Sequence, residues 1–232
     1  MHAGINENDD GGDGGDAVVR VTGPLESIPF LGESPLAGLF PQGRGLTVAY
    51  DYVLAPGAEK VLIRVGVINP APEDIDFGVN RDGSDEIFGF FHYSQNKMVT
   101  PTRGYAEPIG LSDWVGFEGG PWSFAYRLVD GPIEYGLAQS GFSLFWANGF
   151  LAPGCQTTMT DRVEIIAGGP DYDGLREAIR RSGGEPSWRA VTGTLKDAGG
   201  APVEGASVHQ VDSEGLYLSR ATTGQDGSFI IH

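Results

Sequence analysis

The chain of 232 residues is acidic, with a formal net charge of −16 and a sequence pI of about 4.4. Nucleic-acid binders present a basic face, so we expect neither DNA nor RNA as a partner, and anionic membrane surfaces are disfavoured for the same reason. No apolar run approaches the roughly 20 residues that span a bilayer, which argues against membrane insertion.

Glycine and proline are abundant, with 37 and 15 residues, and they follow no collagen-like period. Such a composition is typical of short-stranded β proteins, which need many turns. Residues 1–16 are rich in aspartate, asparagine and glycine, so they predict a disordered acidic segment. This segment contains neither the basic nor the apolar stretch of a secretion signal.

Period-two alternation of apolar residues predicts β-strands along most of the chain. The clearest pair covers 46–54 and 61–68, and a Pro-Gly turn joins the two strands into an antiparallel hairpin. Arg64 lies on the polar side of the second strand, so we expect one face of the hairpin to meet solvent. Further strand regions are predicted at 17–22, 75–79, 87–93, 114–127, 133–146 and 157–166.

The segment 171–182 predicts the one good helix of the chain. Asp173 is the expected N-cap and Gly183 the expected C′ residue. The short apolar stripe of this helix consists of Leu175, Ala178 and Ile179. The polar, glycine-containing residues 183–189 then predict a linker and a domain boundary.

Residues 190–232 alternate between short strands and glycine-containing turns, a pattern that predicts a β-sandwich. Five elements occur in order: Gly193, the runs GAPV (200–203) and GASV (205–208), a Thr-Thr pair, and DGSF (226–229). This set resembles the carboxypeptidase regulatory-like domain, a small transthyretin-like, immunoglobulin-type sandwich. The resemblance implies an accessory role, and it implies a truncated domain because the family pattern continues beyond DGSF with further strands.

A second set of motifs covers most of residues 17–190. It comprises the strand AVVRVTG, a Y-x-L-x-P-G hairpin, a second L-x-P-G before a strand that ends in Ala-Gly-Gly, and the helix. This order resembles the β-supersandwich region, galactose-mutarotase-like in fold, that precedes the catalytic domain of some bacterial polymerase-and-histidinol-phosphatase (PHP) metallohydrolases. The resemblance implies that a downstream catalytic domain is a partner of this chain.

Metal and nucleophile chemistry find little support in the sequence. A PHP-type site needs clustered histidines and aspartates, whereas the four histidines here, His2, His92, His209 and His232, are far apart. There is no G-x-S-x-G motif and no phosphate-binding glycine loop. We therefore predict no catalytic residues, no metal and no cofactor in this chain.

Aromatic residues and carboxylates gather between residues 113 and 146. Rings that stack on C–H groups, beside carboxylates that accept hydroxyl protons, are typical of sugar-binding clefts, and filling of a β-sandwich core is the alternative interpretation. The candidate carbohydrate-binding residues are His92, Trp114, Glu118, Trp122, Tyr126 and Trp146.

A mutarotase-like enzyme is the sharpest catalytic alternative. Its chemistry would use His92 as general acid and Glu107, Glu118 or Glu134 as general base around a sugar ring. The further histidines of a full mutarotase site have no match in this sequence.

The favoured interpretation is an all-β chain in two parts, with domains at 17–182 and 190–232. Its predicted role is that of a non-catalytic accessory region of a larger, extracytoplasmic bacterial protein of the metallohydrolase type, with carbohydrate as a partner. The alternatives are the mutarotase-like enzyme and a purely structural spacer. An aromatic cleft with convergent acids would distinguish a binding module from a spacer.

Overall fold

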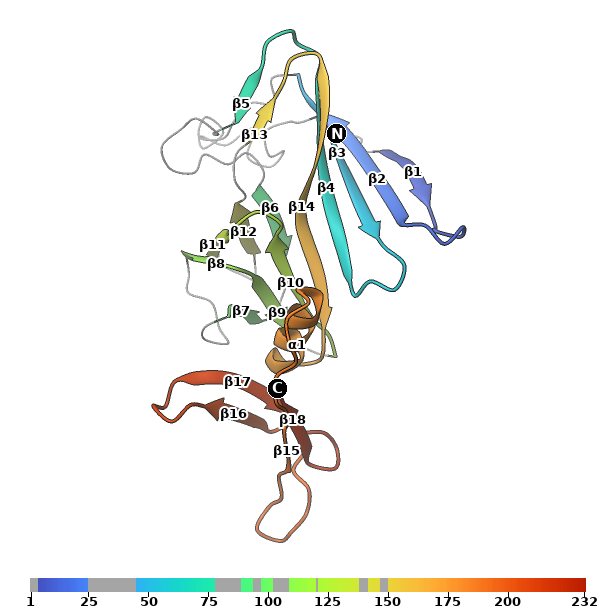
Figure 1. Cartoon of the computed structure of the whole chain (residues 1–232). Helices are drawn as coiled ribbons and strands as arrows, with labels where there is room; N and C mark the ends of the chain where they lie inside the picture. Colours follow the sequence, from blue (N-terminus) through green and yellow to red (C-terminus); the bar gives the residue numbers. More distant parts are fainter. Residues whose placement is uncertain are drawn as a thin grey trace. The chain divides into compact units, whose positions relative to one another are not determined.

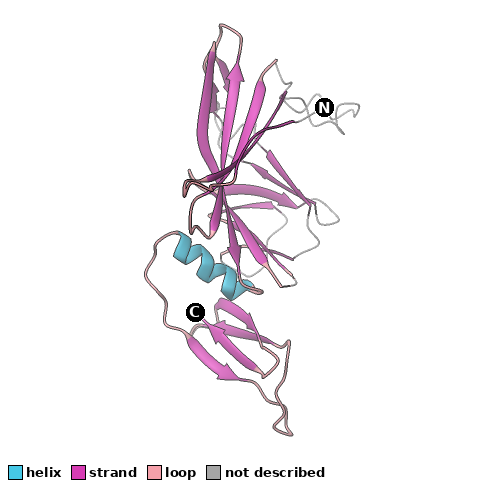
Figure 2. Ribbon diagram, turned by 90° about the vertical axis from the view of Figure 1, so that its right-hand side faces the viewer, coloured by secondary structure: helices cyan, strands magenta, loops and turns pink. Residues whose placement is uncertain are grey.

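The computed structural model describes residues 4–24, 45–77, 89–93, 97–101, 109–119, 121–137, 142–146 and 150–232. Most of these residues form antiparallel β-strands, and the described part contains one helix (Figure 1, Figure 2). The prediction of an all-β, sandwich-like chain is therefore confirmed. No helix of the described residues is both long and apolar enough to cross a membrane.

The chain divides into two compact units. Unit 1 comprises Met1–Phe90 with Trp146–Val163, and unit 2 comprises Phe91–Phe145 with Glu164–His232. Each unit thus consists of two stretches of the chain, and the stretches of the two units alternate along the sequence. The domain division at 183–189 stays a prediction, and the residues from Glu185 to Ala190 form no regular secondary structure.

Unit 1 contains a sheet with the order β1-β2-β3-β4 followed by the first part of β14. Neighbours among the first four strands are antiparallel, and β5 pairs with β13 in a separate two-stranded sheet. The strands are β1 (Gly4–Asp9), β2 (Ala17–Pro24), β3 (Thr47–Leu54), β4 (Lys60–Asn69), β5 (Ile75–Phe77), β13 (Phe150–Ala152) and β14 (Gln156–Gly168).

The hairpin predicted from 46–54 and 61–68 is present as β3 and β4, in the register Tyr50↔Val65. The buried apolar side chains of β4 alternate along the strand, and they are Ile63, Val65 and Val67. The acidic segment at the start of the chain differs from expectation, because strand β1 pairs with β2 there. Backbone pairing along the edge of β2 gives β1 its hydrogen bonds, which a composition argument does not consider.

Among the described residues of unit 1, Asp51 is a buried charge, with 2% of its surface exposed on a strand whose other buried residues are apolar. Arg20 of β2 lies directly opposite in the register and binds both carboxylate oxygens, through Nε at 2.6 Å and Nη2 at 2.5 Å. This bidentate pair supplies the partner that a buried carboxylate requires.

Unit 2 contains the strand order β7-β9-β10 followed by the end of β14, and a four-stranded sheet with the order β6-β12-β11-β8. Two further sheets pair β15 with β18 and β16 with β17, both antiparallel. The strands are β6 (Gly89–Tyr93), β7 (Lys97–Val99), β8 (Ile109–Ser112), β9 (Val115–Glu118), β10 (Ser123–Leu128), β11 (Ile133–Leu137), β12 (Phe142–Trp146), β15 (Val191–Thr194), β16 (Ser207–Val211), β17 (Tyr217–Thr222) and β18 (Ser228–Ile231).

Helix α1 (Tyr172–Ser182) confirms the predicted helix, but its caps differ from the prediction. Asp171, not Asp173, is the N-cap: its backbone is extended and its side chain accepts a hydrogen bond from Gly174 N at 2.9 Å. Asp173 already lies in the first turn. At the other end Gly183 keeps a right-handed conformation, and Gly184 adopts the left-handed one with φ +70°.

The core of unit 2 forms where α1 packs on the β9–β10 layer. The predicted apolar stripe of the helix is buried there, together with Val99, Trp114, Ala125, Ile166 and Tyr172. Gly116 of β9 permits this close packing, because a Cβ at that position would lie 2.4 Å from Leu175 Cδ2. The same helix also contacts β17, so it joins the strands on either side of it in sequence.

We predict that Arg20→Ala lowers the free energy of unfolding by about 2 kcal/mol, because it leaves the buried Asp51 carboxylate without its partner. Urea unfolding followed by circular dichroism measures the change. The matched control is Arg64→Ala, whose partner Asp161 is 47% exposed and whose loss should cost less than about 0.5 kcal/mol. Equal effects of the two variants would contradict this account.

Candidate functional site

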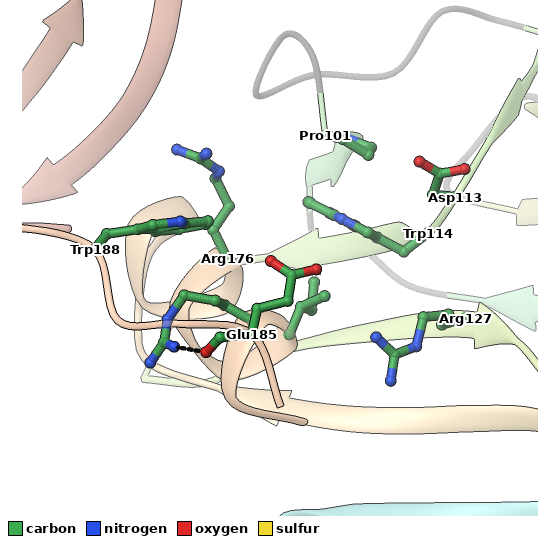
Figure 3. A pocket seen from close by; sticks show the side chains of 9 residues that line it. Pro101, Asp113, Trp114, Arg127, Arg176, Glu185 and Trp188 are labelled. Carbon is green, nitrogen blue, oxygen red and sulfur yellow. Dashed lines mark hydrogen bonds between the residues drawn. The ribbon is translucent and has the colours of Figure 1, made fainter. Parts of the chain in front are cut away.

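The candidate site is a cavity of about 260 Å³ in unit 2 (Figure 3). Its wall combines two indoles with five charged side chains from separate stretches of the chain. The lining residues are Pro101, Asp113, Trp114, Arg127, Arg176, Ile179, Arg180, Glu185 and Trp188.

Helix α1 supplies one wall through Arg176, Ile179 and Arg180. Residues three and four positions apart lie on the same face of a helix, so these three side chains meet the cavity together. Trp114 directly precedes β9 and packs on Tyr172 of the helix, with 6.2 Å between ring centroids. The helix and the β9 layer therefore position the wall residues by the same contact that forms the core.

Another wall of the cavity is formed by Trp188, which lies in the connector, residues 185–190, between α1 and β15. The Arg176 guanidinium lies 4.7 Å from the centroid of its ring, and the Arg180 guanidinium lies at 5.9 Å. Cation–π attraction at these distances holds the connector against the helix. The indole stays 37% exposed, so part of its surface remains accessible to a ligand.

Arg180 is the most constrained cation of the wall. Its Nε and Nη2 donate to the two carboxylate oxygens of Glu177, each at 2.6 Å, and its Nη1 donates to the carbonyl oxygen of Glu185. The hydrogen bonds from Arg180 lower the pKa of the Glu177 carboxyl. The Glu177–Arg180 pair is therefore ionised at neutral pH. The hydrogen bond from Arg180 to the Glu185 carbonyl oxygen attaches the connector to the helix.

Arg127 and Arg176 differ in how their charge is matched. Arg127 donates to Glu164 Oε2 from Nε at 2.7 Å and from Nη2 at 2.6 Å, and it also reaches Ser182 Oγ at 3.2 Å. Arg176 donates from Nη1 to the carbonyl oxygen of Leu218, at 2.7 Å. Among the described residues no carboxylate forms an ion pair with Arg176.

The structure brings one of the predicted carbohydrate-binding residues, Trp114, to this cavity. Its exposed fraction is 7%, so most of the ring belongs to the core and only an edge lines the cavity. Trp122 is 72% exposed and lies between β9 and β10, outside the set of lining residues. The side chains of His92 and Trp146 lie outside the described residues.

Tyr126 and Glu118 have structural partners instead. Tyr126 packs edge-on against the rings of Phe117 and Phe124, at centroid distances of 6.4 and 6.0 Å. Glu118 Oε1 accepts from Arg220 of β17 and lies 3.6 Å from Lys97 Nζ, so this carboxylate fastens β9 to β17. A ligand-binding role for the two residues stays a prediction.

Sequence reasoning missed Trp188, Arg176 and Glu185. Trp188 stands in a segment that its composition predicts to be a linker, where an indole has no strand neighbours to suggest a role. The usable signal was the pairing of that isolated tryptophan with arginines four residues apart on the preceding helix.

The described part of the chain includes two candidate general bases of the enzyme alternative, Glu118 and Glu134. Glu134 is half-buried on β11 and Glu118 is engaged in ion pairs, while the side chains of His92 and Glu107 lie outside the described residues. Within the described residues no three His, Cys, Asp or Glu side chains come close enough to hold a metal ion.

A second cavity, of about 340 Å³, lies at the N-terminal end of α1. It is built around two aspartates that bind the C-terminal strands. Asp171 accepts from Thr222 N at 2.7 Å, and Asp173, which is 1% exposed, accepts from Ser219 Oγ at 2.7 Å. Burial raises the pKa of the Asp171 carboxyl, against the opposing effect of its two backbone hydrogen bonds. These contacts attach β17 to the helix.

Comparisons with known proteins assign no family, since the sequence matches no protein-family model and no curated protein. The structure is similar to an α-galactosidase from Lactobacillus brevis, with 10% identity, a TM-score of 0.46, and coverage of 78% of this chain and 27% of that one. Two GH36 α-galactosidases from Geobacillus stearothermophilus, AgaA and AgaB, are similar at 8% and 7% identity. Both have TM-scores of 0.46 and coverage of 75% of this chain and 27% of theirs.

These neighbours are carbohydrate-processing enzymes, and the present chain spans 27% of their length. Likeness at this level of identity and TM-score assigns neither a family nor an activity to the chain.

We predict that Asp171→Ala lowers the free energy of unfolding by about 2 kcal/mol, because both the helix cap and the bond to Thr222 N are lost. Asp171→Asn keeps one acceptor oxygen and should lose about half as much. Urea unfolding measures the loss of unfolding free energy in each variant. An Asp171→Ala variant as stable as the parent chain would contradict the assignment of Asp171 as the N-cap.

Proposed function

We propose that this chain is a non-catalytic accessory region that binds carbohydrate in the cavity between Trp114 and Trp188, hereafter the tryptophan pocket. It would serve a larger bacterial protein whose catalytic domain, of metallohydrolase type, lies downstream. The observation that carries the proposal is the meeting of two indoles from separate elements with hydrogen-bonding charged groups in one open cavity. Sugar sites combine these two components, because rings stack on C–H groups while polar groups take the hydroxyls.

The size and construction of the pocket support this proposal. About 260 Å³ approaches the lower end of the range for small-molecule sites and suits one sugar ring with its hydroxyls. The helix, the strand layer and the bonded connector each hold their wall residues through contacts that exist without a ligand. A preformed wall reduces the ordering cost of binding.

The structural-spacer alternative makes a different prediction about the same pocket, because a spacer has no reason to bind sugar. The mutarotase-like alternative requires turnover as well as binding. Binding without anomer interconversion is therefore the result that our proposal expects, and polarimetry on the bound sugar separates it from the enzyme.

The test is a glycan-array screen followed by isothermal titration calorimetry on the whole chain and two tryptophan variants. Trp188→Ala should weaken sugar binding roughly tenfold or more, because burial of an aromatic face against a ligand contributes about 1.5–3 kcal/mol. Trp122→Ala is the matched control, since it removes an indole of high exposure that does not line the pocket. Trp122→Ala should leave the affinity unchanged.

Thermal unfolding of both variants checks that they remain folded, and Trp188→Phe should recover part of the affinity. Binding that is lost in Trp122→Ala and kept in Trp188→Ala would move the site to the exposed tryptophan predicted from sequence. The absence of binding to any sugar by the folded parent chain would leave the spacer as the better description.

A further inference from the structure

We infer that the tryptophan pocket selects an uncharged sugar ring over a uronate. The inference rests on the proposed function and specifies its ligand class. It follows from how the charged groups of the pocket are already paired.

Two of the three guanidinium groups have carboxylate partners within the protein. Arg127 is held by Glu164 and Arg180 by Glu177, at 2.6–2.7 Å. A ligand carboxylate would have to compete with these partners, whose geometry is already fixed. The charges of Arg127 and Arg180 are therefore balanced by Glu164 and Glu177, so these two arginines attract an anionic ligand only weakly.

Arg176 is the remaining donor. Its guanidinium carries five N–H groups, and one nitrogen donates to Leu218 O while the plane stacks on Trp188. No other hydrogen bond of Arg176 exists within the described part of the chain. Its other N–H groups can donate to ligand oxygens from a guanidinium that the indole holds in place.

Asp113 and Glu185 supply the acceptors. Both are exposed pocket residues, and neither carboxylate has a hydrogen bond or ion pair to the described residues. In Figure 3 the Trp114 indole lies between these two carboxylates. Ionised carboxylates only accept, and a guanidinium only donates, so the three groups together suit hydroxyls, which do both.

Electrostatics disfavours anionic ligands. A uronate would meet Asp113 and Glu185 in a chain of net charge −16, which repels anions at long range. A neutral polyol avoids this penalty, and the indole edge of Trp114 with Ile179 and Pro101 offers apolar contact to its C–H groups.

The experiment is calorimetry on the full chain with matched probes. The uncharged probes are methyl glucopyranoside and methyl galactopyranoside, and the charged ones are the corresponding glucuronate and galacturonate. We expect at least one uncharged glycoside to bind roughly tenfold tighter than its charged counterpart. Raising the salt concentration tenfold should change that affinity less than about twofold, because no ion pair forms with the ligand.

Asp113→Asn tests the acceptor role. It should weaken binding of the uncharged glycoside roughly 5–10-fold and narrow the gap to the uronate, because one of the two acceptor oxygens becomes a donor amide and the repelling charge is removed. Asp161→Asn, at an exposed position of unit 1, is the matched control and should change neither affinity.

Two outcomes would overturn the inference, and they differ in what they leave standing. A uronate that binds as tightly as its uncharged counterpart, with affinity falling steeply in salt, refutes the ligand class while carbohydrate binding stands. The failure of every probe to bind the folded chain refutes the proposed function, and the inference falls with it.

Discussion

Tyr172, the first residue of α1, is the side chain on which the arrangement of unit 2 depends. It is completely buried, and its hydroxyl lies 2.8 Å from the carbonyl oxygens of both Thr100 and Pro101, after β7. Its ring contacts Trp114 on one strand layer and Tyr217 on β17. A single aromatic side chain thus joins four segments that are distant in sequence.

The pocket follows from that junction. Trp114 and Pro101 are both wall residues, and both are positioned through contacts with Tyr172. The helix that begins at Tyr172 then places Arg176 one turn and Arg180 two turns further along, where both guanidinium groups lie near the Trp188 ring. Core packing and site construction therefore use the same elements, and a change at the junction would disturb stability and binding together.

Local patterns in the sequence predicted the structural features that depend on residues close together in the chain. Alternation located the β3–β4 hairpin and its buried face, and periodicity with a capping residue located the helix. The choice between Asp171 and Asp173 as N-cap was not decidable locally, because both are aspartates at the start of the apolar stripe. Long-range contacts distinguish the two aspartates: Asp173 accepts hydrogen bonds from Ser219 and His232, and Asp171 caps the helix.

Pairings across long sequence separations could not be predicted. Arg20 and Asp51 are 31 residues apart, and Glu118 and Arg220 are 102 apart. The site shows the same limit, because the abundance of aromatic residues between 114 and 146 predicted Trp114 while the second indole came from the connector. Composition identified residue types that are typical of sugar-binding sites, and the tertiary fold determines which of these residues line the same cavity.

The most direct test of the account is a two-dimensional ¹H–¹⁵N spectrum that follows the indole N–H signals of the four tryptophans during a sugar titration. Phenylalanine variants assign each signal. The account predicts that an uncharged methyl glycoside shifts the signals of Trp114 and Trp188 in a saturable way and leaves that of Trp122 in place. A shift confined to Trp122, or no shift in any indole signal, would contradict it.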